Sequence, residues 1–159
     1  MVVKDVVMED FVNYKKPSMF IIFPKCDFKC EKDCGEKLCQ NSDIANLPDI
    51  EVSYEYVVQR YVENSITSSI VFGGLEPFDS PKEMIELVHE LRKVTDDDIV
   101  IYTGYNKDEI VGYVNMLSCY KNIIVKFGRY IPNDTQHEDE LLGINLASKN
   151  QYAERISLC

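Results

Sequence analysis

The chain has 159 residues, of which 45% are hydrophobic and 28% charged, and these values are typical of one globular domain spanning residues 1–159. Its net charge of −10 argues against binding to nucleic acids or to anionic membranes, because no stretch of the sequence concentrates lysine and arginine. The first residues lack a signal-peptide pattern and no apolar run has transmembrane length, so we expect a cytoplasmic protein.

Strand and helix patterns alternate along the chain. Short apolar runs typical of buried strands occur at residues 18–24, 69–72, 98–102 and 122–125, and a last strand is expected near 155–158. Helical patterns begin near Ser53, Ser80 and Asn106. Their inward positions are Tyr54, Val57, Val58, Tyr61 and Val62 in the first helix, Met84, Val88 and Leu91 in the second, and Ile110, Val114 and Leu117 in the third.

The start of the second helix also carries a local signal. The run Ser80-Pro81-Lys82-Glu83 predicts a capping box with proline at the first helical position. Two residues are expected to have ordinary structural roles: His89 as a solvated side chain and Cys119 as a small packing residue. The terminal Cys159 is expected to be mobile, as chain ends commonly are, and a redox role is the weaker interpretation.

This order of elements predicts an α/β fold with a parallel sheet of four to six strands and right-handed crossovers. So few strands cannot close an eight-stranded barrel, so we expect an open or partial (β/α) barrel. Ligands of such sheets bind at the C-terminal strand ends. Three unusual loops leave strands at that end, and they contain the cysteines after residue 24, Gly73-Gly74, and Tyr102-Thr103-Gly104-Tyr105. The sequence therefore predicts a site there.

Four of the six cysteines lie within fourteen residues: Cys26, Cys30, Cys34 and Cys39. Such clustering after an apolar strand indicates a metal site, and without signs of secretion a disulfide is the weaker interpretation. Zinc sites usually use two short cysteine pairs separated by a longer loop. The staggered spacing here favours an iron–sulfur cluster over zinc.

The second loop reads Gly73-Gly74-Leu75-Glu76-Pro77. Two glycines at a strand end let the backbone approach a ligand closely, and the Glu76 carboxylate suits a ligand ammonium group. Pro77 would fix the turn. An ordinary strand-to-helix loop is the alternative for the glycine pair alone. The combination with a cysteine loop one strand earlier is more specific.

Together, these two loops resemble those of the radical S-adenosylmethionine enzymes, whose Cys-x3-Cys-x2-Cys loop holds a [4Fe–4S] cluster with one iron open for S-adenosylmethionine. The resemblance extends from Asp10 to Gln151 and is strongest to the activating proteins of anaerobic (class III) ribonucleotide reductase. The segments that carry it are Asp10-Phe11-Val12-Asn13, Cys39-Gln40-Asn41, Tyr102-Thr103-Gly104-Tyr105 and residues 142–151, which end in Ser148-Lys149-Asn150-Gln151.

The chain departs from the family pattern at the third cysteine. Cys26 and Cys30 match it, but the next cysteine is Cys34 or Cys39. The Gln40-Asn41 that follows Cys39 matches the family and favours Cys39, so that Cys34 falls in an insertion. If all four cysteines bound the cluster, it would be closed and could transfer electrons without binding S-adenosylmethionine at iron.

The resemblance implies that the cluster receives one electron from an external donor such as flavodoxin or ferredoxin. Reductive cleavage of S-adenosylmethionine then yields a 5′-deoxyadenosyl radical, which installs a glycyl radical on a large partner, anaerobic ribonucleoside-triphosphate reductase. It implies that Cys26, Cys30 and Cys39 are the metal ligands and catalytic centre. The implied cofactor-binding residues are Gly73, Gly74, Glu76, Pro77, Asn41, Thr103 and Lys126.

Three alternatives stay open. The chain could activate another glycyl-radical enzyme, or it could be a radical enzyme that acts on a small molecule. From a different class, it could be a non-catalytic zinc or iron–sulfur module that uses all four clustered cysteines, although this leaves the Gly73–Pro77 loop without a role. For Lys126, a solvated surface lysine is the alternative to a cofactor contact.

Overall fold

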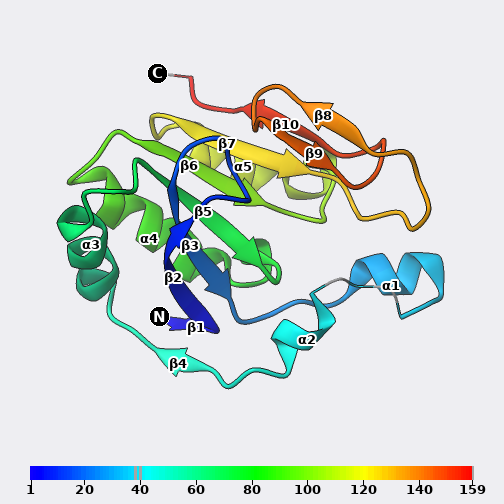
Figure 1. The fold of residues 1–159 in the computed structure, drawn as a ribbon, viewed down its shortest axis with the longest axis horizontal. Helices are drawn as coiled ribbons and strands as arrows, with labels where there is room; N and C mark the ends of the chain where they lie inside the picture. Colours follow the sequence, from blue (N-terminus) through cyan, green and yellow to red (C-terminus); the bar gives the residue numbers. More distant parts are fainter. Residues whose placement is uncertain (38, 40, 159) are drawn as a thin grey trace.

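The computed structural model describes residues 1–37, 39 and 41–158. Its centre is a six-stranded sheet in the order β10-β7-β6-β5-β3-β2 (Figure 1). The four inner strands are parallel: β3 (Ser18–Phe23), β5 (Ser69–Gly74), β6 (Asp98–Tyr102) and β7 (Ile123–Phe127). The edge strands β2 (Asp5–Asp10) and β10 (Tyr152–Arg155) are antiparallel to their neighbours.

The inner strands lie where the apolar runs predict them, and the edge strands differ. The last strand ends at Arg155 instead of spanning 155–158, and β2 has no counterpart among the predicted strands because its apolar run is only Val6-Val7-Met8, between acidic residues. The expectation of an open or partial barrel stays a prediction. Two small antiparallel pairs complete the strands: β1 (Val2–Val3) with β4 (Ile50–Glu51), and β8 (His137–Asp139) with β9 (Ile144–Leu146).

Different elements cover the two faces of the sheet. The alternation of side chains along each strand divides the apolar residues between the faces. One face packs against α3 (Tyr54–Glu63), α4 (Pro81–Arg92) and α5 (Val111–Leu117) and forms the main core. The opposite face presents Val71, Val100 and Ile124, which are covered by Tyr14 and Leu142 and by Leu146 of β9. This second, smaller core leaves space toward the C-terminal strand ends.

The predicted inward faces of the helices are buried at all but a few positions. Only Val62 is clearly wrong, with 61% of its surface exposed, because it lies in the last turn of α3 beyond the edge of the sheet-facing stripe. His89 is exposed, as expected, whereas Cys119 is also exposed and is not a packing residue. Cys159 lies outside the described residues. Among the described helices, none has the length and apolar character needed to cross a membrane.

One capping prediction is wrong at the N-terminus of α4. Pro81 is the first residue of α4, as predicted, but the Ser80 side chain makes no capping hydrogen bond. Ser80 also ends the short 3₁₀ helix η1 (Pro77–Asp79), and its backbone is bent away from the usual capping conformation. The reciprocal capping box occurs instead between Asn106 and Glu109, at the start of the 3₁₀ helix η2 (Lys107–Ile110).

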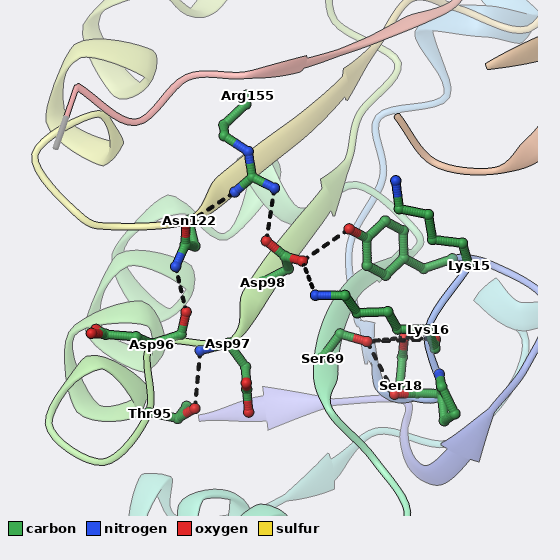
Figure 2. Close-up of polar contacts among 12 residues, drawn as sticks. Lys15, Lys16, Ser18, Ser69, Thr95, Asp96, Asp97, Asp98, Asn122 and Arg155 are labelled. Atoms are coloured by element: carbon green, nitrogen blue, oxygen red, sulfur yellow. Dashed lines mark hydrogen bonds and ion pairs between the residues drawn. The ribbon is translucent and has the colours of Figure 1, made fainter. Parts of the chain in front are cut away.

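A buried carboxylate joins three parts of the fold at the N-terminal end of β6. Asp98 is 6% exposed and accepts hydrogen bonds from Tyr14, Lys16 and Arg155 (Figure 2). Burial alone would raise its pKa, but the hydrogen bonds from Lys16, Arg155 and Tyr14 more than offset this effect, so the pKa lies below its usual value. Asp98, in β6, therefore links the loop between β2 and β3 to β10.

Replacing Asp98 by asparagine is expected to lower the free energy of unfolding at pH 7 by about 2–3 kcal/mol, since it removes an ionised acceptor from three donors. Because the folded-state pKa is depressed, the contribution is present above about pH 4, the unfolded-state value, and is lost as the pH falls through the folded-state pKa. Urea unfolding between pH 3 and 7 measures this. The exposed Asp108→Asn is the control, and equal losses in the two variants would contradict the assignment.

Candidate functional site

A cavity of about 680 Å³ opens at the C-terminal ends of the parallel strands, on the side opposite the three main helices. This volume is within the range of small-molecule and cofactor sites. Eight of the residues predicted for the site line it: Cys26, Cys30, Cys39, Asn41, Gly74, Glu76, Thr103 and Lys126. Gly73 and Pro77 are buried beside it without lining it. The side chains of three separate loops therefore meet at one place.

The cysteine segment leaves β3 and passes through two short helices, α1 (Lys29–Cys34) and α2 (Ser42–Ala45). Cys26, Cys30 and Cys39 are half-buried and line the large cavity. Cys34 is exposed, and its Sγ contacts the carbonyl oxygens of Glu31 and Glu36. Cys34 lines a separate hollow of about 360 Å³, to which Cys30 also contributes. The structure thus places Cys34 outside the large cavity, whereas Cys30 lines both spaces.

The three cavity cysteines form a set of sulfur donors of the kind that holds an iron–sulfur cluster. The charge of Cys39 interacts with those of both Cys26 and Cys30, and all three thiols line the same cavity. Burial raises the pKa of Cys26 to about 12 and also raises that of Cys39. A raised pKa favours the protonated thiol. A coordinating metal reverses this preference, because a metal-bound thiol is deprotonated.

Backbone amides already point at two of these sulfurs. The N–H of Phe28 donates to Cys26 Sγ at 3.3 Å, and that of Asn41 donates to Cys39. Phe28 has φ 54°, a left-handed conformation that is unfavourable for a bulky residue and costs about 1–3 kcal/mol. Hydrogen bonds to the sulfurs are a feature of iron–sulfur sites, where they tune the cluster. The residues present therefore fit such a cluster.

Glu76 ties two of the loops together. Its Oε1 accepts hydrogen bonds from Thr103 Oγ1 at 2.8 Å and from the Phe78 N–H at 3.1 Å, and its Oε2 accepts from the Gly104 N–H at 2.8 Å. Burial raises the pKa of Glu76 to about 7, although these three hydrogen bonds partly offset it. A carboxylate has about four acceptor positions, so Glu76 retains capacity for one further donor.

Lys126, in β7, is 6% exposed, so the alternative of a solvated surface lysine is wrong. Its strand position places it on the face of Ile124, where the cavity lies. Burial lowers its pKa to about 8, partly offset by the nearby Cys30 and Glu76. Its Nζ donates to the Gly128 carbonyl at 3.0 Å. An ammonium group with three donors therefore faces the cavity, and within the described part of the chain it donates to one carbonyl, that of Gly128.

Sequence reasoning missed several residues that fix the loops around the cavity. Asp79 accepts hydrogen bonds from the Asp27 N–H at 2.8 Å and from the Tyr105 hydroxyl at 2.7 Å, and Lys29 Nζ lies 3.8 Å from the centre of the Tyr105 ring. These contacts fix the start of the cysteine segment against the loop after β6. They join residues far apart in sequence, and apart from Tyr105, which belongs to the Tyr102–Tyr105 turn, no periodicity or local motif marks them.

Gln151, at the end of the segment similar to the activating proteins, has a defined position. Its side-chain oxygen accepts from the N–H groups of Ala147 and Ser148, and its amide nitrogen donates to the Gly128 carbonyl. Gln151 is buried, lines the cavity and holds residues 147–148 beside the loop after β7. Gln151 therefore shapes the wall of the cavity.

Comparison with known protein families supports the metal chemistry of this site. Residues 17–152 match the family model described as a 4Fe–4S single cluster domain, which covers most of the chain and all four clustered cysteines. No curated protein and no solved structure matched the chain. The match agrees with the sulfur donors gathered at the C-terminal strand ends and supports iron–sulfur binding. The chain therefore belongs to the family of 4Fe–4S single cluster domains.

Proposed function

We propose that this protein is a radical S-adenosylmethionine enzyme that installs a glycyl radical on anaerobic ribonucleoside-triphosphate reductase. The observation that supports this most directly is that Cys26, Cys30 and Cys39 line the large cavity while Cys34 does not. Three thiolate ligands leave one iron of a [4Fe–4S] cluster without a protein ligand. When bound, such a cluster supplies the electron that cleaves S-adenosylmethionine to methionine and a 5′-deoxyadenosyl radical.

The rest of the cavity offers groups suited to the methionyl part of S-adenosylmethionine. The Lys126 ammonium can pair with a carboxylate, and Glu76 can accept a hydrogen bond from an ammonium. Both side chains are nearly fully buried, so ion pairs with them gain strength from the low local dielectric. Thr103, Asn41 and the Gly74 backbone line the same space and would contact the remaining parts of the cofactor.

The partner in this proposal is a large glycyl-radical enzyme, with an external one-electron donor such as flavodoxin or ferredoxin. The cavity is open to solvent, and a radical formed in it needs a cover that excludes water and other reactants. A glycine loop of the partner that enters the cavity mouth would supply both the cover and the hydrogen atom that is removed.

The test is anaerobic incubation of the iron-loaded protein with dithionite and S-adenosylmethionine, followed by addition of the cognate reductase. We expect 5′-deoxyadenosine, and then the doublet EPR signal of a glycyl radical on the reductase. Lys126→Met should weaken S-adenosylmethionine binding about 10- to 100-fold while iron content stays near wild type, because it removes a charge-assisted contact. Lys82→Met, which changes an exposed lysine on α4, is the matched control.

Other results would replace the proposal. Cluster-containing protein that forms no 5′-deoxyadenosine would be an electron-transfer module, and colourless protein containing zinc would be a zinc module. If 5′-deoxyadenosine forms and a different glycyl-radical enzyme acquires the radical, the partner is wrong. Conversion of a small molecule without any protein radical would identify a small-molecule radical enzyme.

A further inference from the structure

Helix α1, which contains Cys30, extends away from the sheet (Figure 1), and a largely buried arginine connects this helix to the body of the protein. Arg129 follows β7, and its Nε lies 2.8 Å from Asp33 Oδ2, with 15% of the Arg129 side chain exposed. Asp33 is three residues after Cys30, so the two side chains lie on the same side of α1. An ion pair at Asp33 therefore acts on the turn of helix that holds Cys30.

A second carboxylate fixes Arg129 independently of α1. The Arg129 Nη1 and Nη2 donate to Glu109 Oε2 and Oε1 at 2.7 and 2.6 Å, the two-pronged geometry that orients a guanidinium most strongly. Glu109 is itself held, because its Oε2 accepts the Asn106 N–H at 2.8 Å in the capping box of η2. Hydrogen bonding to Arg129 lowers the pKa of Glu109 to about 2, so Glu109 is ionised at neutral pH. Arg129 is thus a rigid anchor.

The aliphatic part of Arg129 and the Cys30 sulfur both lie near Gly104. A Cβ atom placed on Gly104 would be 3.4 Å from Cys30 Sγ and 4.0 Å from Arg129 Cγ. The charges of Arg129 and Cys30 interact, and both residues line the smaller hollow. A fixed positive charge next to a cluster ligand favours the reduced cluster, which carries one more electron.

We propose that Arg129 is a positioning residue of the cluster site, which fixes Cys30 through Asp33 and raises the reduction potential of the cluster through its own charge. This inference rests on Cys30 being a cluster ligand, as in the proposed function. It also assigns a role to Asp33, which lies between Cys30 and Cys39. The ion pair of Asp33 with Arg129 holds the helix turn that contains Cys30.

The experiment measures the reduction potential of the cluster by EPR during a redox titration, and iron retention during incubation with a chelator, in iron-loaded full-length variants. Arg129→Gln should shift the potential to more negative values, and Asp33→Asn should shift it to less negative values, since the two changes remove opposite charges. Both substitutions should lower the affinity for iron by about tenfold or more, because residues that orient metal ligands usually contribute this much to metal affinity. Arg60→Gln, an exposed arginine on α3 near Glu63, is the control and should change neither quantity.

Opposite shifts of the potential would support the charge effect, because general loosening of α1 would move both variants in the same direction. The inference is overturned if Arg129→Gln and Asp33→Asn match Arg60→Gln in both measurements, or if their potentials shift together. Should Arg129→Gln fail to fold, the exposed Asp33 provides the decisive variant. The reduction potential and the iron retention can be measured without cleavage of S-adenosylmethionine. A protein that binds the cluster but does not cleave S-adenosylmethionine would therefore contradict the proposed function without contradicting this inference.

Discussion

Replacement of Cys26, Cys30 or Cys39 by serine is expected to lower the iron content of the anaerobically purified protein by roughly tenfold or more, because thiolates are the preferred ligands of iron–sulfur clusters. Cys34→Ser should retain the iron, since Cys34 is exposed and lines a different hollow from Cys39. Iron and sulfide analysis of the four variants, with EPR of the reduced proteins, measures this difference.

The Cys34 variant is also the internal control, because it removes a clustered thiol outside the large cavity. A second measurement then examines the open iron. Addition of S-adenosylmethionine should change the EPR spectrum of reduced wild-type and Cys34→Ser protein alike, because cluster spectra respond to ligation. An iron-free Cys34→Ser protein beside an iron-containing Cys39→Ser protein would show that the third ligand is Cys34.

Substitution of Gly74 by alanine is expected to lower the free energy of unfolding by about 2–4 kcal/mol, by the sum of a backbone cost and an overpacking cost. Gly74 has φ +78°, a conformation that alanine adopts unfavourably, and its Cβ would lie 2.4 Å from Ile22 Cγ2 and 3.3 Å from the Ile22 Cα. Ile22 belongs to β3 and pairs with Gly73, so the clash presses on the neighbouring strand just before the cysteine segment. Iron binding should weaken as well.

Gly112→Ala is the matched control for this substitution. Gly112 lies in α5 with nothing within 4 Å of its added Cβ, so alanine there should be neutral or stabilising by up to about 1 kcal/mol. Urea unfolding of both variants, with iron analysis, measures the two effects. A Gly74→Ala protein as stable as Gly112→Ala would mean that the strand end relaxes freely and that glycine is dispensable at this position.

The sequence by itself determined the inner strands and the apolar faces of the three main helices. These features depend on local periodicity: a strand buried on both faces is a continuous apolar run, and a helix on a sheet has apolar residues three and four positions apart. It also brought the cysteine segment and the Gly73–Pro77 loop to one place, since parallel strands end at the same edge of a sheet. The edge strand β2, whose apolar run is only three residues long, carries neither pattern and was missed.

Only the tertiary structure decided which groups meet. Spacing left Cys34 and Cys39 as alternatives, and the path of α1 turns the Cys34 side chain toward solvent while Cys39 lines the cavity. The burial of Lys126 follows from the chain segments that cover its face of the sheet, which no local pattern around residue 126 encodes. The contacts of Arg129 with Asp33 and Glu109 join residues from separate loops. Such contacts depend on the path of the whole chain, whereas periodicity reports only on near neighbours in sequence.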